Sequence, residues 1–200
     1  MDFAVWMMMG ALGALVLTRV DQARRVMLLR RVLAPYQIEK LLETLTEGYL
    51  RALGEDDAER RRAVWLVMDG HETVLSGQLQ RLAQDMAGLP AADTRFSTLP
   101  LALPMASRLP LPSADFRQVV RLHAEGFATV AANGEGLSAR DKAFRLSAEL
   151  LLFQHSCHAF CRSRGVASAR LAARHGTTHA QALAAASAAT RDGLRAAGLA

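Results

Sequence analysis

Apolar residues run without a charge from Phe3 to Thr18, and the rest of the chain carries apolar residues at the spacing of amphipathic helices. At about 1.5 Å of rise per residue, the first run would form a helix roughly 24 Å long. A bilayer core is about 30 Å thick and usually takes about 20 residues, but Val20 and a snorkelling Arg19 extend the run. We therefore predict a membrane anchor over residues 1–19.

Two alternatives stay open for this run. A cleaved signal peptide has a basic segment before its apolar part, whereas here the first charge is Asp2 and Arg19 follows the run. A buried helix in a globular core also accommodates an apolar stretch of this length. We favour a retained span because Trp6 and three consecutive methionines leave the run without a polar face.

A basic segment follows the apolar run. Between residues 19 and 31 it holds five arginines against one aspartate, namely Arg19, Arg24, Arg25, Arg30 and Arg31. Basic flanks are retained in the cytoplasm, and arginine gains about 1 kcal/mol near anionic headgroups. We predict a basic juxtamembrane helix over residues 20–34 with these arginines at the membrane interface. The protein would then be a single-pass protein of a bacterial inner membrane, with its N-terminus outside and the bulk of the chain in the cytoplasm.

Four later segments place apolar residues on one helical face. They cover residues 38–53, 55–86, 113–130 and 138–164, and Gly or Pro residues follow them. Useful strand-like alternation is absent from the sequence, so we predict an all-α protein with an antiparallel bundle of four to six helices over residues 35–175. The Ala-rich residues 176–200 are predicted to form a C-terminal helix or tail.

The connector at residues 89–113 holds five of the six prolines, which excludes a continuous helix there. It keeps five leucines as candidate partner contacts: Leu99, Leu101, Leu103, Leu109 and Leu111. The simplest role for these leucines is to cover the protein's own core. A binding strip for another protein is the functional alternative.

Two cysteines and two histidines have the spacing of a zinc site. Cys157 and Cys161 lie four positions apart, as do His175 and His179, and two thiolates with two imidazoles suit tetrahedral zinc. A classical finger needs a hairpin where this sequence predicts a helix, so a helical zinc site bent at Gly165 is the better form of this hypothesis. The other alternative is a pair of free thiols, because four-residue spacing on a helix suits a disulfide poorly.

The remaining histidines lie on predicted helices. His71 and His123 fall on apolar stripes, so we expect core imidazoles that hydrogen-bond to a neighbouring helix. His155 and His158 are expected to face solvent or an interface.

No reaction centre is recognisable in the sequence. A P-loop, a GxGxxG turn, a GxSxG elbow and a Glu-x-x-His pair are all absent, which excludes common nucleotide-binding, acyl-transfer and di-iron classes. The net charge of +5 could indicate nucleic acid, but a neighbouring anchor favours lipid for the basic segments.

We therefore expect a membrane-anchored adaptor or assembly scaffold that has no catalytic activity and no cofactor. Its partners would be lipid and another protein, and any small-molecule substrate is unknown. The alternative is a zinc-binding or thiol-redox protein that uses the Cys157, Cys161, His175 and His179 cluster.

Overall fold

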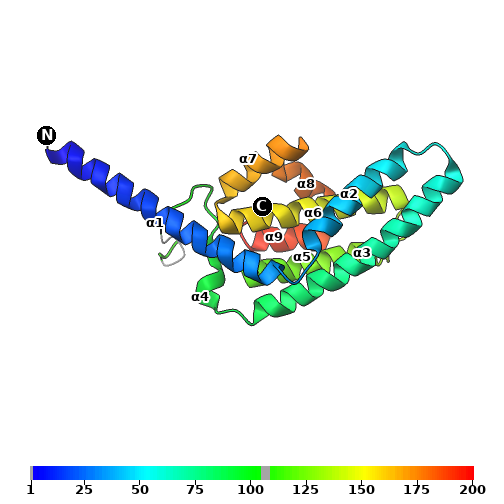
Figure 1. Cartoon of the computed structure of the whole chain (residues 1–200), viewed down its shortest axis with the longest axis horizontal. Coiled ribbons are helices and arrows are strands. Elements are labelled where there is room, and N and C mark those ends of the chain that lie inside the picture. Colours follow the sequence, from blue (N-terminus) through cyan, green and yellow to red (C-terminus); the bar gives the residue numbers. More distant parts are fainter. Residues whose placement is uncertain (1, 105–108) are drawn as a thin grey trace.

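The computed structural model describes residues 2–104 and 109–200, with side chains from Val5 onward. Within these residues the chain forms nine helices and one two-stranded sheet, which confirms the predicted all-α class and the helical bundle (Figure 1). The helices are α1 (Asp2–Leu33), α2 (Ile38–Gly54), α3 (Ala58–Ala87), α4 (Ala91–Thr94), α5 (Phe116–Ala131), α6 (Ala139–Cys161), α7 (Arg164–His175), α8 (His179–Ala185) and α9 (Ala188–Ala196). The strands are β1 (Arg95–Ser97) and β2 (Ser113–Asp115).

Helix α1 is continuous over the predicted anchor and the predicted juxtamembrane segment. It ends just before Pro35, because proline cannot donate a helical hydrogen bond and restricts the residue before it. Its first half projects away from the bundle, whereas its second half packs against α6 and α3 and buries Leu29 (Figure 1). One helix therefore carries both an exposed and a packed segment.

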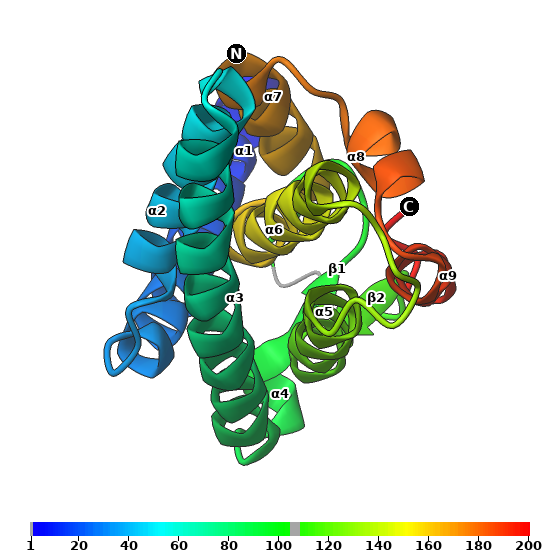
Figure 2. The ribbon, with the colours of Figure 1, turned by 90° about the vertical axis from the view of Figure 1, so that its right-hand side faces the viewer.

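The bundle is held by apolar faces that follow the predicted periodicity. Helix α3 packs against α2 and α5, and α6 packs against α5, α7 and α8 (Figure 2). The predicted face of α5 is buried, including Val119 and Phe127, and so is that of α2, including Leu45 and Tyr49, up to Leu53, which is 53% exposed. Burial of each large apolar side chain contributes about 1.5–3 kcal/mol, so these faces supply most of the stability of the bundle.

Two helix boundaries differ from the sequence prediction. Helix α5 begins at Phe116 and not after Ser113, because residues 113–115 pair with β1 and Asp115 caps the helix by accepting a hydrogen bond from the backbone N–H of Arg117. Helix α6 begins after Ser138 as predicted but ends at Cys161, because Ser163 caps the separate helix α7.

The short antiparallel sheet joins the two ends of the connector. Phe96 in β1 pairs with Ala114 in β2, and its ring lies 6.0 Å from Phe116 and 5.7 Å from Phe160, measured between ring centroids. Phe116 and Phe160 stack at 4.3 Å. This aromatic cluster shows that the start of the connector covers the core.

The C-terminal residues 176–200 form part of the bundle. Gly176 ends α7 in a left-handed conformation with φ of 60°, and α8 and α9 then pack onto α6 and α5. Buried Leu183, Leu194 and Leu199 fix this segment. The Ala-rich composition therefore corresponds to two short packed helices.

Candidate functional site

The exposed half of α1 is the most unusual surface of the described chain. Trp6 is 71% exposed, Met8 68%, and Leu12 and Leu15 62% each. The four successive residues Trp6, Met7, Met8 and Met9 are each at least 59% exposed, and they point to different sides of the helix because successive residues are about 100° apart. The apolar surface thus surrounds the helix, and a buried core helix is excluded for residues 5–20.

No helix has a stretch that is long and apolar enough to cross a membrane, within the residues whose side chains are described.

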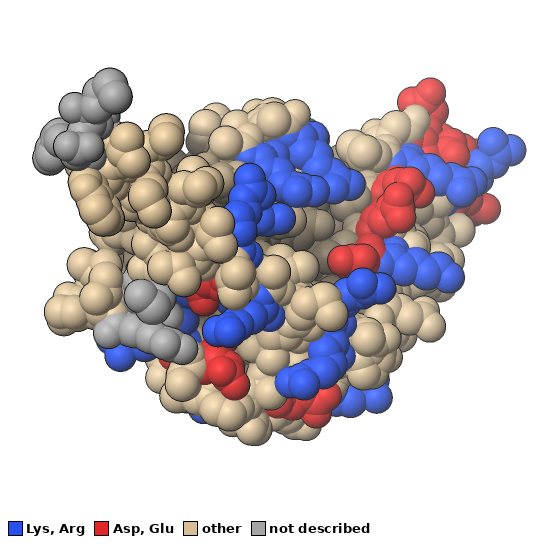
Figure 3. Space-filling model, turned by 60° about the vertical axis from the view of Figure 1, so that its left-hand side comes forward, with Lys and Arg blue, Asp and Glu red and all other residues tan. Residues whose placement is uncertain are grey.

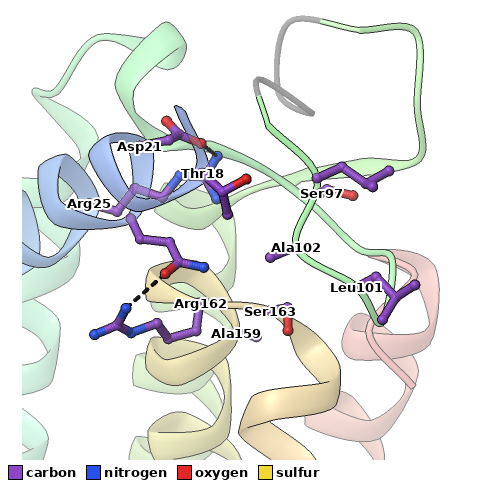
Figure 4. Close-up of a pocket in the computed structure, with 11 residues that line it drawn as sticks. Thr18, Asp21, Arg25, Ser97, Leu101, Ala102, Ala159, Arg162 and Ser163 are labelled. Carbon is purple, nitrogen blue, oxygen red and sulfur yellow. Dashed lines mark hydrogen bonds and ion pairs between the residues drawn. The ribbon is translucent and has the colours of Figure 1, made fainter. Parts of the chain in front are cut away.

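The exposed half ends where α1 meets the C-terminal end of α6. Arg25 forms an ion pair with Asp21 at 2.9 Å, donates a hydrogen bond to the carbonyl oxygen of Phe160 at 3.3 Å, and lies over the Phe160 ring. Arg162 donates a hydrogen bond to Gln22 at 2.7 Å (Figure 4). These contacts hold the base of the projecting segment on the bundle.

A small hollow lies at this junction. Its volume is about 20 Å³, and it is lined by residues of α1, the connector and α6, including Thr18, Leu101 and Ser163 (Figure 4). A space of this size accommodates a single water molecule. The described residues of the junction are therefore closely packed.

The five arginines predicted at a membrane interface divide into two groups. Arg19, Arg24, Arg30 and Arg31 are exposed, as that role requires. Arg25 differs, because its side chain is only 12% exposed, forms an ion pair with Asp21 and hydrogen-bonds to α6. Arg25 is a structural link between the two helices, which the sequence alone did not reveal.

The connector leucines are unevenly exposed. Leu101 is 71% exposed, Leu103 41% and Leu109 48%, whereas Leu99 and Leu111 are half-buried. Residues 105–108 between them lie outside the described residues. The Leu101–Leu103 region borders the α1 junction, so the candidate partner strip lies beside the projecting helix.

The Cys and His residues of the predicted zinc site are not assembled into a metal centre. Cys157 and Cys161 are free thiols on α6, His175 ends α7, and His179 begins α8. Within the described parts of the chain, no group of three or more His, Cys, Asp or Glu residues is placed to hold a metal ion. Burial raises the pKa of Cys161 to about 11, so this thiol is protonated in the folded protein at neutral pH.

Two of the histidine predictions are wrong. His155 is buried, hydrogen-bonds through Nε2 to Ser168 Oγ at 3.0 Å, and lies 4.1 Å from His179 between ring centroids. His71 is only half-buried, and its Nδ1 contacts the carbonyl oxygen of Val67 in its own helix. The next residue, Glu72, is the one that points into the core, and it is buried.

The prediction for His123 is confirmed. It is 1% exposed on α5, and its Nε2 lies 2.9 Å from Ser156 Oγ on α6. Burial lowers the pKa of His123 to about 3, so the imidazole is neutral in the folded protein. His158 is half-buried on α6.

A buried polar network connects three helices and was missed by sequence reasoning. Tyr49 on α2 donates a hydrogen bond to Glu72 on α3 at 2.8 Å, and Lys142 on α6 contacts Glu72 at 2.6 Å and Asp69 at 2.8 Å. Burial raises the pKa of Glu72, and Lys142 and Tyr49 oppose that effect. The only sequence signal was an acidic residue within an apolar stripe.

A groove of about 710 Å³ lies beside this network, between the end of α2 and the start of α6. Its walls include exposed Leu50 and Phe144, and Tyr49 lines it as well. Tyr49 donates to Glu72, and Lys142 is paired with Glu72 and Asp69, so these side chains link the three helices beside the groove.

Comparison with known proteins gives no relative for this chain: no family model, no curated protein and no solved structure matches it.

Proposed function

We propose that the protein is a membrane-attached helical scaffold, in which the exposed half of α1 inserts into a lipid bilayer and the bundle presents surfaces to another protein. The observation that carries this proposal is the exposure of apolar side chains on every side of α1 between Val5 and Val20.

The exposed apolar surface is large enough to drive insertion. Ten large apolar side chains of this half are at least 45% exposed: Val5, Trp6, Met7, Met8, Met9, Leu12, Leu15, Val16, Leu17 and Val20. Removing the exposed part of each from water gains on the order of 1 kcal/mol, hence on the order of 10 kcal/mol together.

Lipid suits this surface better than a single protein partner. A docking partner covers one stripe of a helix and leaves the opposite side in water, whereas acyl chains surround a helix completely. The arginines at the base of the segment suit phosphate headgroups. In a bacterial inner membrane, they would hold the bundle on the cytoplasmic face.

The scaffold part of the proposal rests on the bundle and its connector. Leu101 and Leu103 of the connector expose apolar surface beside the α1 junction, and Leu109 is exposed further along the connector. A protein that binds there would be held close to the membrane surface. No described cluster of side chains favours a reaction, so we propose no catalytic role.

Flotation with phosphatidylcholine vesicles tests the insertion of α1. Leu12→Asp with Val16→Asp places two charges in the exposed half of α1, and we expect it to abolish flotation of the purified full chain. The matched control is Leu66→Asp with Val67→Asp, because Leu66 and Val67 on α3 are 73% and 54% exposed, close to the 62% and 54% of the α1 pair. Flotation of the α1 variant together with the vesicles would refute the proposal.

A further inference from the structure

Two arginine-rich segments without acidic residues meet in the folded protein. Neither residues 22–38 nor residues 162–191 contain Asp or Glu. The second segment carries five arginines, namely Arg162, Arg164, Arg170, Arg174 and Arg191. The hydrogen bond from Arg162 to Gln22 joins the two segments at the base of the projecting helix.

Several arginines lie around this contact. Arg19 lies three positions before Gln22, hence about one turn away on the same side of α1. His155 on α6 hydrogen-bonds to Ser168 on α7 at 3.0 Å, which holds the middle of α7 against the second half of α6. The charges of Arg170 and Arg174 also contribute to lowering the pKa of His158, which lies one turn before Arg162 on α6. The two arginines of α7 therefore lie near the same end of α6 as Arg162.

These arginines are not neutralised within the fold. Arg162, Arg170 and Arg174 are exposed. No carboxylate forms an ion pair with any of them within the described part of the chain, whereas Arg25 is paired with Asp21. Uncompensated guanidinium groups in one region attract a polyanion or a surface of phosphates.

The placement of α7 relative to α1 suits a flat anionic surface. In Figure 1, α7 starts near the middle of α1 and runs across the direction of that helix. Figure 3 shows Lys and Arg side chains gathered beside the projecting apolar helix. A bilayer entered by the first half of α1 would therefore lie close to α7.

We propose that Arg19, Arg162, Arg170 and Arg174 form a lipid-headgroup surface that binds the phosphates of anionic lipids beside the inserted helix. This inference rests on the proposed insertion of α1 and adds the lipid class and the face of the bundle turned to the membrane. Each arginine near an anionic surface contributes about fivefold to partitioning at low salt. The surface thus favours an anionic leaflet over a neutral one and orients the bundle.

Vesicles of two compositions test the headgroup surface. The full chain is titrated with phosphatidylcholine vesicles and with vesicles that contain 30% phosphatidylglycerol, at low and at high salt. We expect tighter binding to the anionic vesicles and a loss of this gain as salt rises. Arg170→Gln with Arg174→Gln should weaken binding to anionic vesicles roughly 30-fold and leave binding to neutral vesicles unchanged.

Arg60→Gln with Arg62→Gln is the matched control. Both residues are exposed at the start of α3 and make no described side-chain contact, so this variant removes the same charge from another surface. It should retain nearly all of the anionic preference. Equal losses in the two variants would show an effect of net charge only and would overturn the inference.

The other outcomes are distinguishable. Equal binding of the wild-type chain to both vesicle types overturns the headgroup surface but leaves the insertion of α1 intact. Absence of binding to either type overturns the insertion and with it the inference. If anionic vesicles show no preference while a duplex DNA oligonucleotide binds and depends on Arg170 and Arg174, the surface serves nucleic acid and the inference is wrong.

Discussion

Arg162 and Gln22 are 140 positions apart in the chain, yet Nη1 of the arginine donates a hydrogen bond to Oε1 of the glutamine at 2.7 Å. This contact, with that of Arg25 to Phe160, defines where α1 leaves the bundle. The position of this junction divides α1 into a packed half and an exposed half.

Arg25→Ala should loosen α1 from the bundle. The side chain is 12% exposed and contacts both Asp21 and the Phe160 carbonyl, so its loss removes a partly buried ion pair and a charge-assisted hydrogen bond. We expect the free energy of unfolding to fall by about 2 kcal/mol in urea titrations. Arg24→Ala is the control, since Arg24 is exposed and should change stability by less than about 0.5 kcal/mol.

Lys142→Met should be strongly destabilising, because it leaves Glu72 buried without its cation. We expect a loss of about 3 kcal/mol in the free energy of unfolding at pH 7, measured by chemical denaturation. Burial already raises the pKa of Glu72, and the variant lacks the lysine that opposes this effect. The folded variant therefore binds a proton at Glu72 more readily than the unfolded chain does, and protonation stabilises its folded state. The deficit relative to wild type should therefore shrink as the pH falls from 7 to 5.

Asp69→Asn is the control for this network. The Asp69 side chain is 57% exposed, so its contact with Lys142 should be worth less than about 1 kcal/mol. Equal effects of the two substitutions would contradict the view that Glu72 is the critical buried charge.

The stability of the protein should fall in mild acid because two histidines are buried as neutral imidazoles. Burial lowers the pKa of His123 and of His155 to about 3, compared with about 6.5 in the unfolded chain. The unfolded state binds more protons below pH 6.5, so stability is lost as the pH falls from there toward 3. At pH 5 the loss is about 2 kcal/mol for each histidine.

Thermal melting between pH 7 and pH 5 measures this dependence. His155→Gln removes one titrating group and should make the fall in melting temperature shallower, whatever its effect at pH 7. An unchanged slope would show that His155 does not cause the acid sensitivity.

Gly126→Ala should disturb the contact between α5 and α9. A Cβ at this position would overlap Thr190 Oγ1 and approach Glu149 Oε2 to 3.1 Å. The Thr190 hydroxyl donates a hydrogen bond to Glu149, and the buried Glu149 carboxylate also accepts a hydrogen bond from the backbone N–H of Ser187. We expect a loss of about 1–3 kcal/mol in unfolding free energy, from overpacking.

The matched substitution is Gly70→Ala, in the middle of α3 where a Cβ would meet nothing within 4 Å. Alanine is the better helix former, so this variant should gain about 0.5–1 kcal/mol. The same sign of change in both variants would contradict the close approach at Gly126.

Helical periodicity predicted the parts of the fold that depend on local sequence. The apolar face of α2, the start of α6 after Ser138 and the end of the basic helix near residue 34 all follow from residue spacing and backbone chemistry. The pairing of β1 with β2 was not predictable, because three-residue strands carry no periodic signal. Their register depends on Phe96 entering a core that forms only in the folded chain.

The candidate site was predicted in part. The exposed apolar run and four of its flanking arginines were identified from the sequence, but the burial of Arg25 depends on the distant Phe160. The Cys and His spacing suggested a metal site that the structure does not assemble, because Cys157 and Cys161 lie on one helix, while His175 and His179 end and begin two others. Spacing along a chain does not fix where the helices of a bundle place their side chains.

Trp6 offers the most direct test of insertion by α1. In a Trp65→Phe background it is the remaining tryptophan, and it is 71% exposed in the absence of lipid. Insertion predicts that its fluorescence shifts to the blue with vesicles and is quenched by lipids brominated deep in their acyl chains, while aqueous iodide loses access. Unchanged emission, with iodide quenching as strong as without lipid, would contradict the account.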